Sequence, residues 1–345
     1  MHPIIAALLS AVLFGASTPF AKRLSGDMSP VLLAGLLYLG SGVGLWAIRL
    51  LGRRRLAFPQ LPARDWGWFF GAIAAGGMIG PVLLMAGLRQ SSASSASLLL
   101  NLESVLTAAL AWIVFREPAG PRVVLGMVLI VAGGVVLAWP HGNAGTASLR
   151  GALFIAAACA CWGLDNNLTR KVSSADADFI AATKGLVAGM TNLLVALALG
   201  AELPRPAVLG AAMGIGLFGY GASLVLFVVA LRGLGSARAG AYFSTAPFLG
   251  AVIAVIALHE PTPANFWLSA ALMAIGVALH LTERHAHAHE HHPHIHSHPH
   301  VHDEHHRHEH DFEWDGVEPH VHEHQHLALR HEHPHYPDLH HRHAH

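Results

Sequence analysis

The chain has 345 residues, of which 53% are apolar and 12% are charged, and its formal net charge is zero when histidine is neutral. A soluble globular domain carries roughly 25% charged residues, so this composition argues against a soluble domain and indicates a membrane protein. The balanced charge gives no reason to expect nucleic acid as a partner.

Ten apolar runs follow one another along the chain, and each is long enough to cross the hydrocarbon core of a bilayer. The connections between them are short and rich in Gly and Pro, which leaves no room for a soluble domain. No basic segment precedes the first run, so it is interpreted as a membrane span and not as a signal peptide. The predicted spans are 3–21, 30–50, 67–88, 94–115, 122–140, 149–169, 178–200, 206–231, 236–258 and 263–282.

The distribution of Arg and Lys predicts the orientation of the spans. The strongest cluster, Arg49 to Arg64, connects the second and third spans. Twelve basic residues lie on the side of that cluster and five on the other side, namely Lys22, Arg23, Arg89, Arg150 and Arg205. Positive residues are retained in the cytoplasm, so we expect an inner-membrane protein with both termini cytoplasmic.

The two cysteines, Cys159 and Cys161, lie in one apolar run and are two residues apart. On a helix they point to different sides. We therefore interpret them as small residues at a contact between helices, and not as a disulfide or a metal site.

The apolar region also repeats. Residues 88–118 align without gaps on residues 231–261, at an offset of 143. Phe14-Gly15 aligns with Trp162-Gly163 at an offset of 148. Each repeat holds five spans, an odd number, so the second repeat must be inverted relative to the first. The sequence predicts domains 1–143 and 144–284, with a substrate site near the midplane between them, as in alternating-access carriers.

An aromatic-Gly pair in the first span of each repeat, with Glu117-Pro118 and Glu260-Pro261 after the fourth spans, resembles EamA-type permeases of the drug/metabolite transporter superfamily. The resemblance covers residues 3–282. It implies an all-α polytopic membrane protein of ten transmembrane helices in two inverted five-helix repeats. It also implies a transporter and not an enzyme, commonly an exporter of small metabolites such as amino acids.

Polar side chains inside spans are costly, so each needs a reason. Glu103 lies near the middle of the fourth span, close to Asn101. Without water a carboxyl group favours its protonated form, as a proton-coupled carrier requires. The alternative is a neutral Glu that hydrogen-bonds to a neighbouring helix. Its repeat counterpart is Ala246, so the two halves are not chemically equal.

Lys184 lies inside the seventh span, and three interpretations stay open. Its ammonium group pairs with Glu103, binds a substrate carboxylate, or extends to the cytoplasmic headgroups. Tyr220, Trp112 and Trp162 are candidates for a cavity lining, but aromatic residues in helix bundles more often pack or serve as interface anchors. Further candidates for the transport pathway are Asp165, Asn166, Thr18, Asn192 and Tyr242.

Residues 285–345 hold 25 of the 29 histidines, many of them at alternate positions. Neutral imidazole suits Zn²⁺, Ni²⁺ and Co²⁺, so the sequence predicts a disordered, cytoplasmic tail that binds transition metals. A functionless low-complexity tail and a pH sensor remain alternatives. The predicted metal-binding residues are His287, His289, His294, His296, His298, His300, His302, His320, His322, His324 and His326.

Three functional hypotheses follow. The first is a proton-coupled exporter whose tail links transport to Ni, Co or Zn homeostasis. The second is an amino-acid or metabolite exporter whose tail only regulates, and the third is a membrane-anchored metal buffer or sensor that does not transport. No cofactor is required beyond the tail metals. The expected partners are a small-molecule or metal-ion substrate and the lipid bilayer, and a homodimer is allowed.

Overall fold

The computed structural model describes residues 2–51, 65–114, 119–139, 149–171, 177–282, 286–291, 294–300, 320–326 and 329–334. The chain divides into two compact units, Met1–Glu283 and Arg284–His345, and each is described by itself. The predicted boundary between residues 143 and 144 lies outside the described residues.

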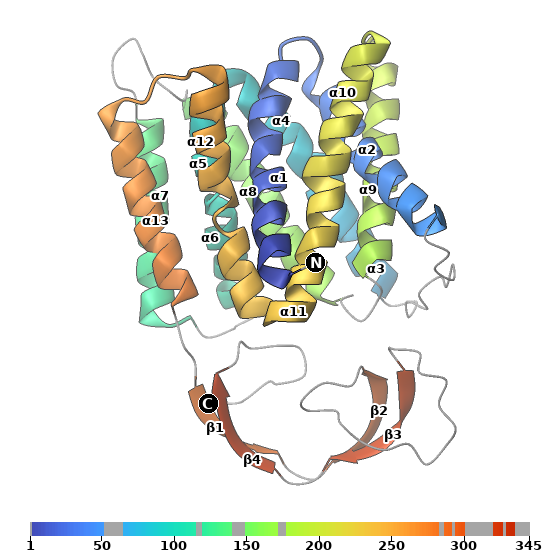
Figure 1. The fold of residues 1–345 in the computed structure, drawn as a ribbon, viewed down its shortest axis with the longest axis vertical. Helices are drawn as coiled ribbons and strands as arrows, with labels where there is room; N and C mark the ends of the chain where they lie inside the picture. The colour runs from blue at the N-terminus through green and yellow to red at the C-terminus, as the bar shows by residue number, and fades with distance from the viewer. Residues whose placement is uncertain are drawn as a thin grey trace. The chain divides into compact units, whose positions relative to one another are not determined.

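The first unit is a bundle of helices (Figure 1). Its first half contains α1 (Pro3–Leu24), α2 (Pro30–Leu51), α3 (Trp66–Ala72), the π-helix η2 (Ile73–Ile79), α4 (Gly80–Gln90), α5 (Ala93–Leu99), α6 (Leu102–Ile113) and α7 (Pro121–Ala138). Its second half contains α8 (Leu149–Lys171), α9 (Ala177–Ala198), α10 (Pro206–Gly216), the π-helix η4 (Leu217–Ala222), α11 (Ser223–Phe243), α12 (Ala246–Leu258) and α13 (Ala264–Leu281).

These helices give the ten predicted segments. Within the described ranges, nine segments are long and apolar enough to cross a membrane by length and composition. The tenth, α8, has 23 residues, but its hydropathy is lowered by Asp165, Asn166 and Asn167. The predicted fold class, a polytopic all-α membrane protein, is confirmed for the bundle. Helix α8, the span with the lowered hydropathy, carries residues of the candidate site.

Helix packing in the bundle is pseudo-symmetric. In two pairs, one at each side of the bundle in Figure 1, each helix packs on its own repeat counterpart: α2 on α9, and α7 on α13. The first helix of each repeat packs on the other repeat, since α1 packs on α11 and α12 while α8 packs on α4 and α6. Gly126 and Gly276 let α7 and α13 approach closely, since a Cβ atom on either would lie 2.7 Å from the other's carbonyl oxygen.

The local breaks recur at matching positions. Subtracting the offset of 143 from η4 (Leu217–Ala222) gives residues 74–79, which lie within η2 (Ile73–Ile79). The turn at Leu100–Asn101 between α5 and α6 recurs as the turn at Ser244–Thr245 between α11 and α12, at an offset of 144, one residue more. The predicted spans 94–115 and 236–258 correspond to the apolar segments Ala93–Ile113 and Ala239–Leu258, and each of these contains a turn that the prediction did not include. Average hydropathy senses apolar length but not local hydrogen bonding.

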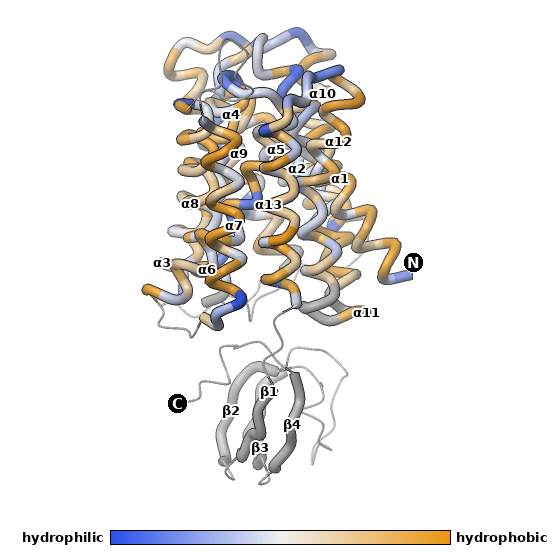
Figure 2. The backbone as a smooth tube through the Cα atoms, turned by 90° about the vertical axis from the view of Figure 1, so that its left-hand side faces the viewer, coloured by the Kyte–Doolittle hydropathy of each residue, from blue (hydrophilic) through white to orange (hydrophobic). Residues whose placement is uncertain are grey.

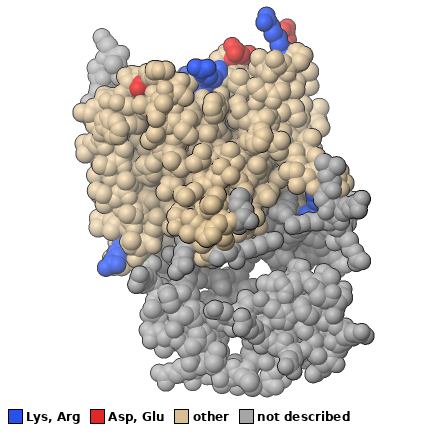
Figure 3. All heavy atoms as spheres, viewed as in Figure 1, with Lys and Arg blue, Asp and Glu red and all other residues tan. Residues whose placement is uncertain are grey.

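The outer surface of the bundle has the polarity of a membrane-embedded protein. In Figure 2 the helices are largely orange and pale along their length, with blue at the ends. On the face shown in Figure 3, Lys, Arg, Asp and Glu of the described residues gather towards the two ends. Large apolar side chains such as Ile113 and Ile256, which are 73% and 68% exposed, therefore face lipid.

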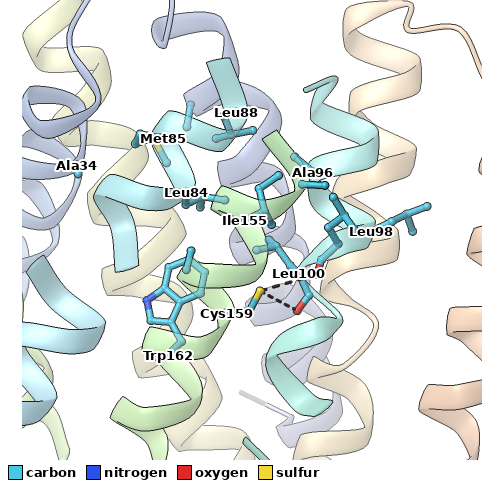
Figure 4. Close-up of a cluster of buried hydrophobic side chains, with 14 of the residues drawn as sticks. Ala34, Leu84, Met85, Leu88, Ala96, Leu98, Leu100, Ile155, Cys159 and Trp162 are labelled. Carbon is cyan, nitrogen blue, oxygen red and sulfur yellow. Dashed lines mark hydrogen bonds between the residues drawn. The ribbon is translucent and has the colours of Figure 1, made fainter. Parts of the chain in front are cut away.

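A buried apolar cluster joins the two repeats (Figure 4). Leu84 and Met85 of α4 and Leu98 of α5 lie in one cluster with Ile155 and Cys159 of α8. The Cys159 thiol points to the turn after α5, where the carbonyl oxygens of Leu99 and Leu100 lie 3.8 and 4.0 Å from its Sγ atom. Cys159 is thus a buried residue at a helix contact, as predicted.

In the second unit, the structure describes four strands: β1 (Ala286–His291), β2 (His294–His300), β3 (His320–His326) and β4 (Leu329–Pro334). β1 pairs antiparallel with β4, and β2 pairs antiparallel with β3. In the second pair, four histidines of β2 are Cα partners of four histidines of β3. These segments are described by their pairing alone, and disorder of the tail stays a prediction. The rest of the tail lies outside the described residues.

Candidate functional site

A cavity of about 270 Å³ lies inside the bundle, between the two repeats. Helices α1, α2 and α6 of the first repeat and α8, α9, η4 and α11 of the second all contribute to its wall. A site at the interface of inverted repeats is where alternating-access carriers bind their substrates. The lining residues are Phe14, Tyr38, Ser41, Glu103, Trp162, Asn166, Ala181, Lys184, Gly185, Tyr220, Ser223, Leu224, Phe227 and Phe243.

Glu103 enters this cavity from the first turn of α6. Its Oε1 atom accepts a hydrogen bond of 3.0 Å from Nδ2 of Asn166, on α8. The same amide nitrogen lies 3.3 Å from Oγ1 of Thr107, and the neighbouring Asn167 donates to the Thr107 carbonyl at 3.2 Å. The side-chain amides of Asn166 and Asn167 therefore join α8 to α6, the helix that carries Glu103. The hydrogen-bond partner of the Glu103 carboxyl group is uncharged.

Lys184 of α9 also lines the cavity, and its ammonium group is paired with the carboxylate of Asp165 on α8. Thr169 donates a further hydrogen bond of 3.0 Å to Oδ1 of Asp165. The two side chains are 18% and 6% exposed, so the pair is held away from bulk solvent. The pairing of Lys184 with Glu103, one of the three interpretations left open, is therefore replaced by pairing with Asp165.

The π-helix η2 supports this polar group through its backbone. The Gly76 carbonyl accepts hydrogen bonds of 2.9 Å from both the Tyr38 hydroxyl and Nε1 of Trp162. Asn192 donates to the Met78 carbonyl at 3.1 Å. A π-turn leaves carbonyl groups that a regular helix would use internally, and π-turns are frequent at functional sites. Here the side chains of three other helices use those carbonyls.

Gly76 also permits the close approach of α8. A Cβ atom at this position would lie 1.9 Å from Oδ2 and 2.6 Å from Cβ of Asp165. No side chain fits in that space unless the acid moves. The glycine of the π-helix therefore fixes the position of the Asp165–Lys184 ion pair.

A second part of the cavity lining is aromatic. Successive ring centroids lie 5.5 Å apart for Tyr38 and Tyr220, 6.0 Å for Tyr220 and Phe14, 5.2 Å for Phe14 and Phe243, and 4.7 Å for Phe243 and Phe227. We call these five residues the aromatic wall. It begins beside the Gly76 carbonyl and ends on α11.

The structure separates the predicted pathway residues into two groups. Glu103, Asn166 and Lys184 line the cavity, and Asp165 contacts it through Lys184. The other four do not line it: Asn101 donates to the Leu98 carbonyl, Asn192 to that of Met78, Thr18 is buried, and Tyr242 packs on a cluster of alanines.

Sequence reasoning missed most of the aromatic wall. Tyr220 and Trp162 were considered for the cavity, but Phe14, Tyr38, Phe227 and Phe243 were not. Phe14 had one available signal, because its repeat counterpart is Trp162, one residue before the equivalent glycine. The other aromatic residues carry no sequence signal that separates lining from packing.

The predicted metal ligands lie in the second unit, outside this cavity's lining. His302 lies outside the described residues, and of the other predicted histidines only the backbone is described. Within the described part of the chain, no three His, Cys, Asp or Glu side chains are grouped so that they could hold a metal ion.

Comparison with known proteins gives three findings. The EamA-like transporter family matches residues 1–139 and 149–282. A relative named "Uncharacterized transporter", from Methanothermobacter thermautotrophicus, is 30% identical over 290 residues, which are 79% of this chain and 84% of the relative. A solved structure titled "Crystal structure of protein" has a TM-score of 0.60 at 21% identity, over 80% of this chain and 95% of that one, which supports the fold alone.

Proposed function

Since the chain belongs to the EamA-like transporter family, we propose that its bundle is a secondary transporter that moves a small organic solute by alternating access. The observation that carries this proposal is the cavity between the repeats, to which both repeats contribute polar and aromatic residues. Its volume of about 270 Å³ is near the lower end of the roughly 300–1,000 Å³ of small-molecule sites. The solute is therefore small.

An organic solute suits this lining better than a bare metal ion. Lys184 places a cation in the wall, which opposes the entry of a second, unshielded cation. The aromatic wall offers apolar surface, which a hydrated metal ion does not use. The bundle thus fits the hypothesis of a metabolite exporter more closely than that of a metal exporter.

Proton coupling is assigned to Glu103. Lys184 is already neutralised by Asp165, whereas the hydrogen-bond partner of Glu103 is the uncharged amide of Asn166. A carboxyl group in such a place accepts and releases a proton without breaking an ion pair. Ionisable groups inside membrane proteins commonly form proton pathways.

Proton flux in proteoliposomes tests the proposal. Vesicles loaded with a pH-sensitive dye receive, one at a time, the common amino acids, aliphatic and aromatic amines, monocarboxylates, sugars, and Ni²⁺, Co²⁺ and Zn²⁺. We expect at least one organic solute to drive proton flux through the wild-type protein. Flux driven by the metal ions alone would contradict the proposal.

Two variants give this experiment its control. Glu103→Gln keeps an oxygen that accepts from Asn166 but cannot ionise, so solute-driven proton flux should fall to the level of protein-free vesicles. Glu202→Gln removes an acid that is exposed in the connection between α9 and α10, and it should behave as wild type. Equal flux in wild type and Glu103→Gln would remove Glu103 from the coupling.

The direction and location belong to the same proposal. The excess of Arg and Lys on one side supports an inner-membrane protein with both termini in the cytoplasm, and export as the direction of transport is proposed from the resemblance to the family alone. A reporter that fluoresces in the cytoplasm and a phosphatase that is active outside it would be fused after Thr282. Fluorescence without phosphatase activity is expected, and the opposite pattern would reverse the orientation.

For the second unit, the proposed role is binding of Zn²⁺, Ni²⁺ or Co²⁺ beside the transporter. The support is the alternation of histidine in the sequence and the register of β2 with β3, in which four pairs of histidines are Cα partners. Equilibrium dialysis of the full chain and of a truncation after Arg284 tests this role. Bound metal should be lost with the tail and below about pH 6, where imidazole is protonated. Metal retained by the truncated protein would contradict it.

A further inference from the structure

The aromatic wall is not explained by the repeat architecture. At the offset of 143, Tyr220, Phe227 and Phe243 correspond to Gly77, Leu84 and Leu100. Glycine and leucine therefore support the same helix positions in the other repeat. The fold therefore does not require the three rings of the second repeat, and they are available to contact a cargo, whereas Phe14 and its counterpart Trp162 are aromatic in both repeats.

The wall presents contact surface as well as packing. All five of its residues line the cavity, and each is only partly buried. The angles between neighbouring rings range from 40° for Tyr38 and Tyr220 to 83° for Phe14 and Tyr220. Tilted and edge-on rings of this kind offer both faces and edges to a further ring.

The charges around the cavity leave one carboxyl group without a cation. Among the described residues, the charged side chains that line the cavity or pair with a lining residue are Glu103, Asp165 and Lys184. Asp165 and Lys184 neutralise each other. Tyr38 uses its hydroxyl on the Gly76 carbonyl, and Asn166 is neutral. The Glu103 carboxyl group is therefore the one charged group of this set without a partner of opposite charge. A cationic ligand would neutralise it.

We propose that the cargo is an aromatic amine, a small cation whose ring packs on the aromatic wall and whose ammonium group binds the Glu103 carboxylate. This inference rests on the proposed function and names the substrate class of the same cavity. The face of an aromatic ring also attracts a cation, so the wall and the acid favour the same ligand. A carboxylate on the cargo would instead have to displace Asp165 from Lys184.

The same geometry explains how transport couples to protons. Glu103 holds either a proton or the ammonium group, because both neutralise the same carboxylate. When the amine enters, the proton leaves Glu103, and when a proton returns from the other side, the amine is released. No bond other than this O–H bond is made or broken.

Four probes of matched structure test the cargo class in the proteoliposome assay: 2-phenylethylamine, butylamine, L-phenylalanine and phenylacetate. We expect 2-phenylethylamine to drive proton flux with the lowest KM, and butylamine to need at least about tenfold more, since ring burial is worth about 1.4 kcal/mol or more. Transport of L-phenylalanine or phenylacetate with an equal or lower KM would overturn the inference but leave the carrier standing. Equal KM values for the two amines would contradict the proposal that the aromatic wall binds the ring of the cargo.

Variants of the wall give a second, independent readout. Phe227→Leu and Phe243→Leu should each raise the KM for 2-phenylethylamine by about three- to tenfold, the size of an aromatic contact, and leave that for butylamine within about twofold. Phe243→Tyr keeps the ring and should restore the wild-type KM. Phe70→Leu changes an aromatic residue that is 57% exposed on α3 and serves as the matched control. An equal rise for both amines would show a general loss of structure and would contradict the assignment.

Discussion

The two repeats share their backbone and differ in the chemistry they bring to the cavity. Both have a π-helix at the same position, a break in the fourth span, and an aromatic-Gly pair in the first. Gly76 in η2 packs against Asp165, and its counterpart Gly219 in η4 packs against Ser17, the counterpart of Asp165. The same contact thus holds an ion-paired acid in one repeat and a hydroxyl group in the other.

This difference separates two requirements of a carrier. Equivalent backbones give two equivalent arrangements of the bundle, as alternating access needs. Unequal side chains allow one set of charges to serve a single cargo, since Glu103 faces the cavity while its counterpart, Ala246, is fully buried beside α1. Breaking one member of each equivalent pair should therefore have unequal consequences.

The largest difference in lost stability is expected between substitutions of Asp165 and of its counterpart, Ser17. Asp165→Asn leaves the Lys184 ammonium group buried without its partner, which costs about 3–5 kcal/mol. Ser17→Ala removes a hydrogen bond to the Phe14 carbonyl within the same helix and one between the Ser17 and Tyr220 side chains, each worth about 1 kcal/mol. Thermal unfolding in detergent, followed by size-exclusion chromatography, compares the two.

A double variant controls this comparison. Asp165→Asn combined with Lys184→Met removes both charges and should recover most of the lost stability, because the uncompensated cation is gone. If the double variant were no more stable than Asp165→Asn alone, the ion pair would not be the source of the loss.

A smaller inequality is expected between Gly15 and Gly163, which hold the first spans against the opposite repeat. A Cβ atom at Gly15 would lie 2.4 Å from the Ala246 carbonyl oxygen, whereas one at Gly163 would lie 3.0 Å from the Thr107 nitrogen. We expect Gly15→Ala to cost about 1–3 kcal/mol and Gly163→Ala less than about 1 kcal/mol. The same unfolding assay measures both, and the reverse order would contradict the packing described.

The smallest effect is expected at Glu260, whose carboxylate oxygens accept hydrogen bonds of 2.7 Å from the backbone N–H groups of Ala93 and Ser94. This contact fastens the end of α12 in one repeat to the start of α5 in the other. Glu260→Gln retains one acceptor and should cost about 1 kcal/mol. Glu202→Gln, on an exposed loop, should change stability by less than about 0.5 kcal/mol. Equal effects would mean that the cap contributes nothing.

The bundle could be predicted from sequence because a long run of apolar residues identifies a membrane span. The predicted span 30–50 corresponds to α2 (Pro30–Leu51), and 149–169 corresponds to α8 (Leu149–Lys171). The π-helices and the turn at Leu100–Asn101 could not be predicted, because a change in backbone hydrogen bonding leaves average hydropathy unchanged. The recurrence of the π-helix at an offset of 143, and of the turn at an offset of 144, is visible only in the structure.

The charged residues in and beside the cavity could be predicted from the sequence for an energetic reason. Glu103, Lys184 and Asp165 stand out because charge is costly in lipid. Their pairing did not follow, since sequence gives the depth of a residue along its span but not the direction in which it points. The aromatic wall was inaccessible for the opposite reason: Phe227 and Phe243 are as stable facing lipid as facing a cavity.

The most direct test of the central claim is the proton balance of cargo binding. Purified protein in weakly buffered detergent solution receives 2-phenylethylamine while the pH is recorded. We expect the wild-type protein to release a proton as the amine binds, and Glu103→Gln to release none. Amine binding without proton release in the wild type, or equal release by Glu103→Gln, would contradict the claim that one acid, present in only one repeat, exchanges the proton for the cargo.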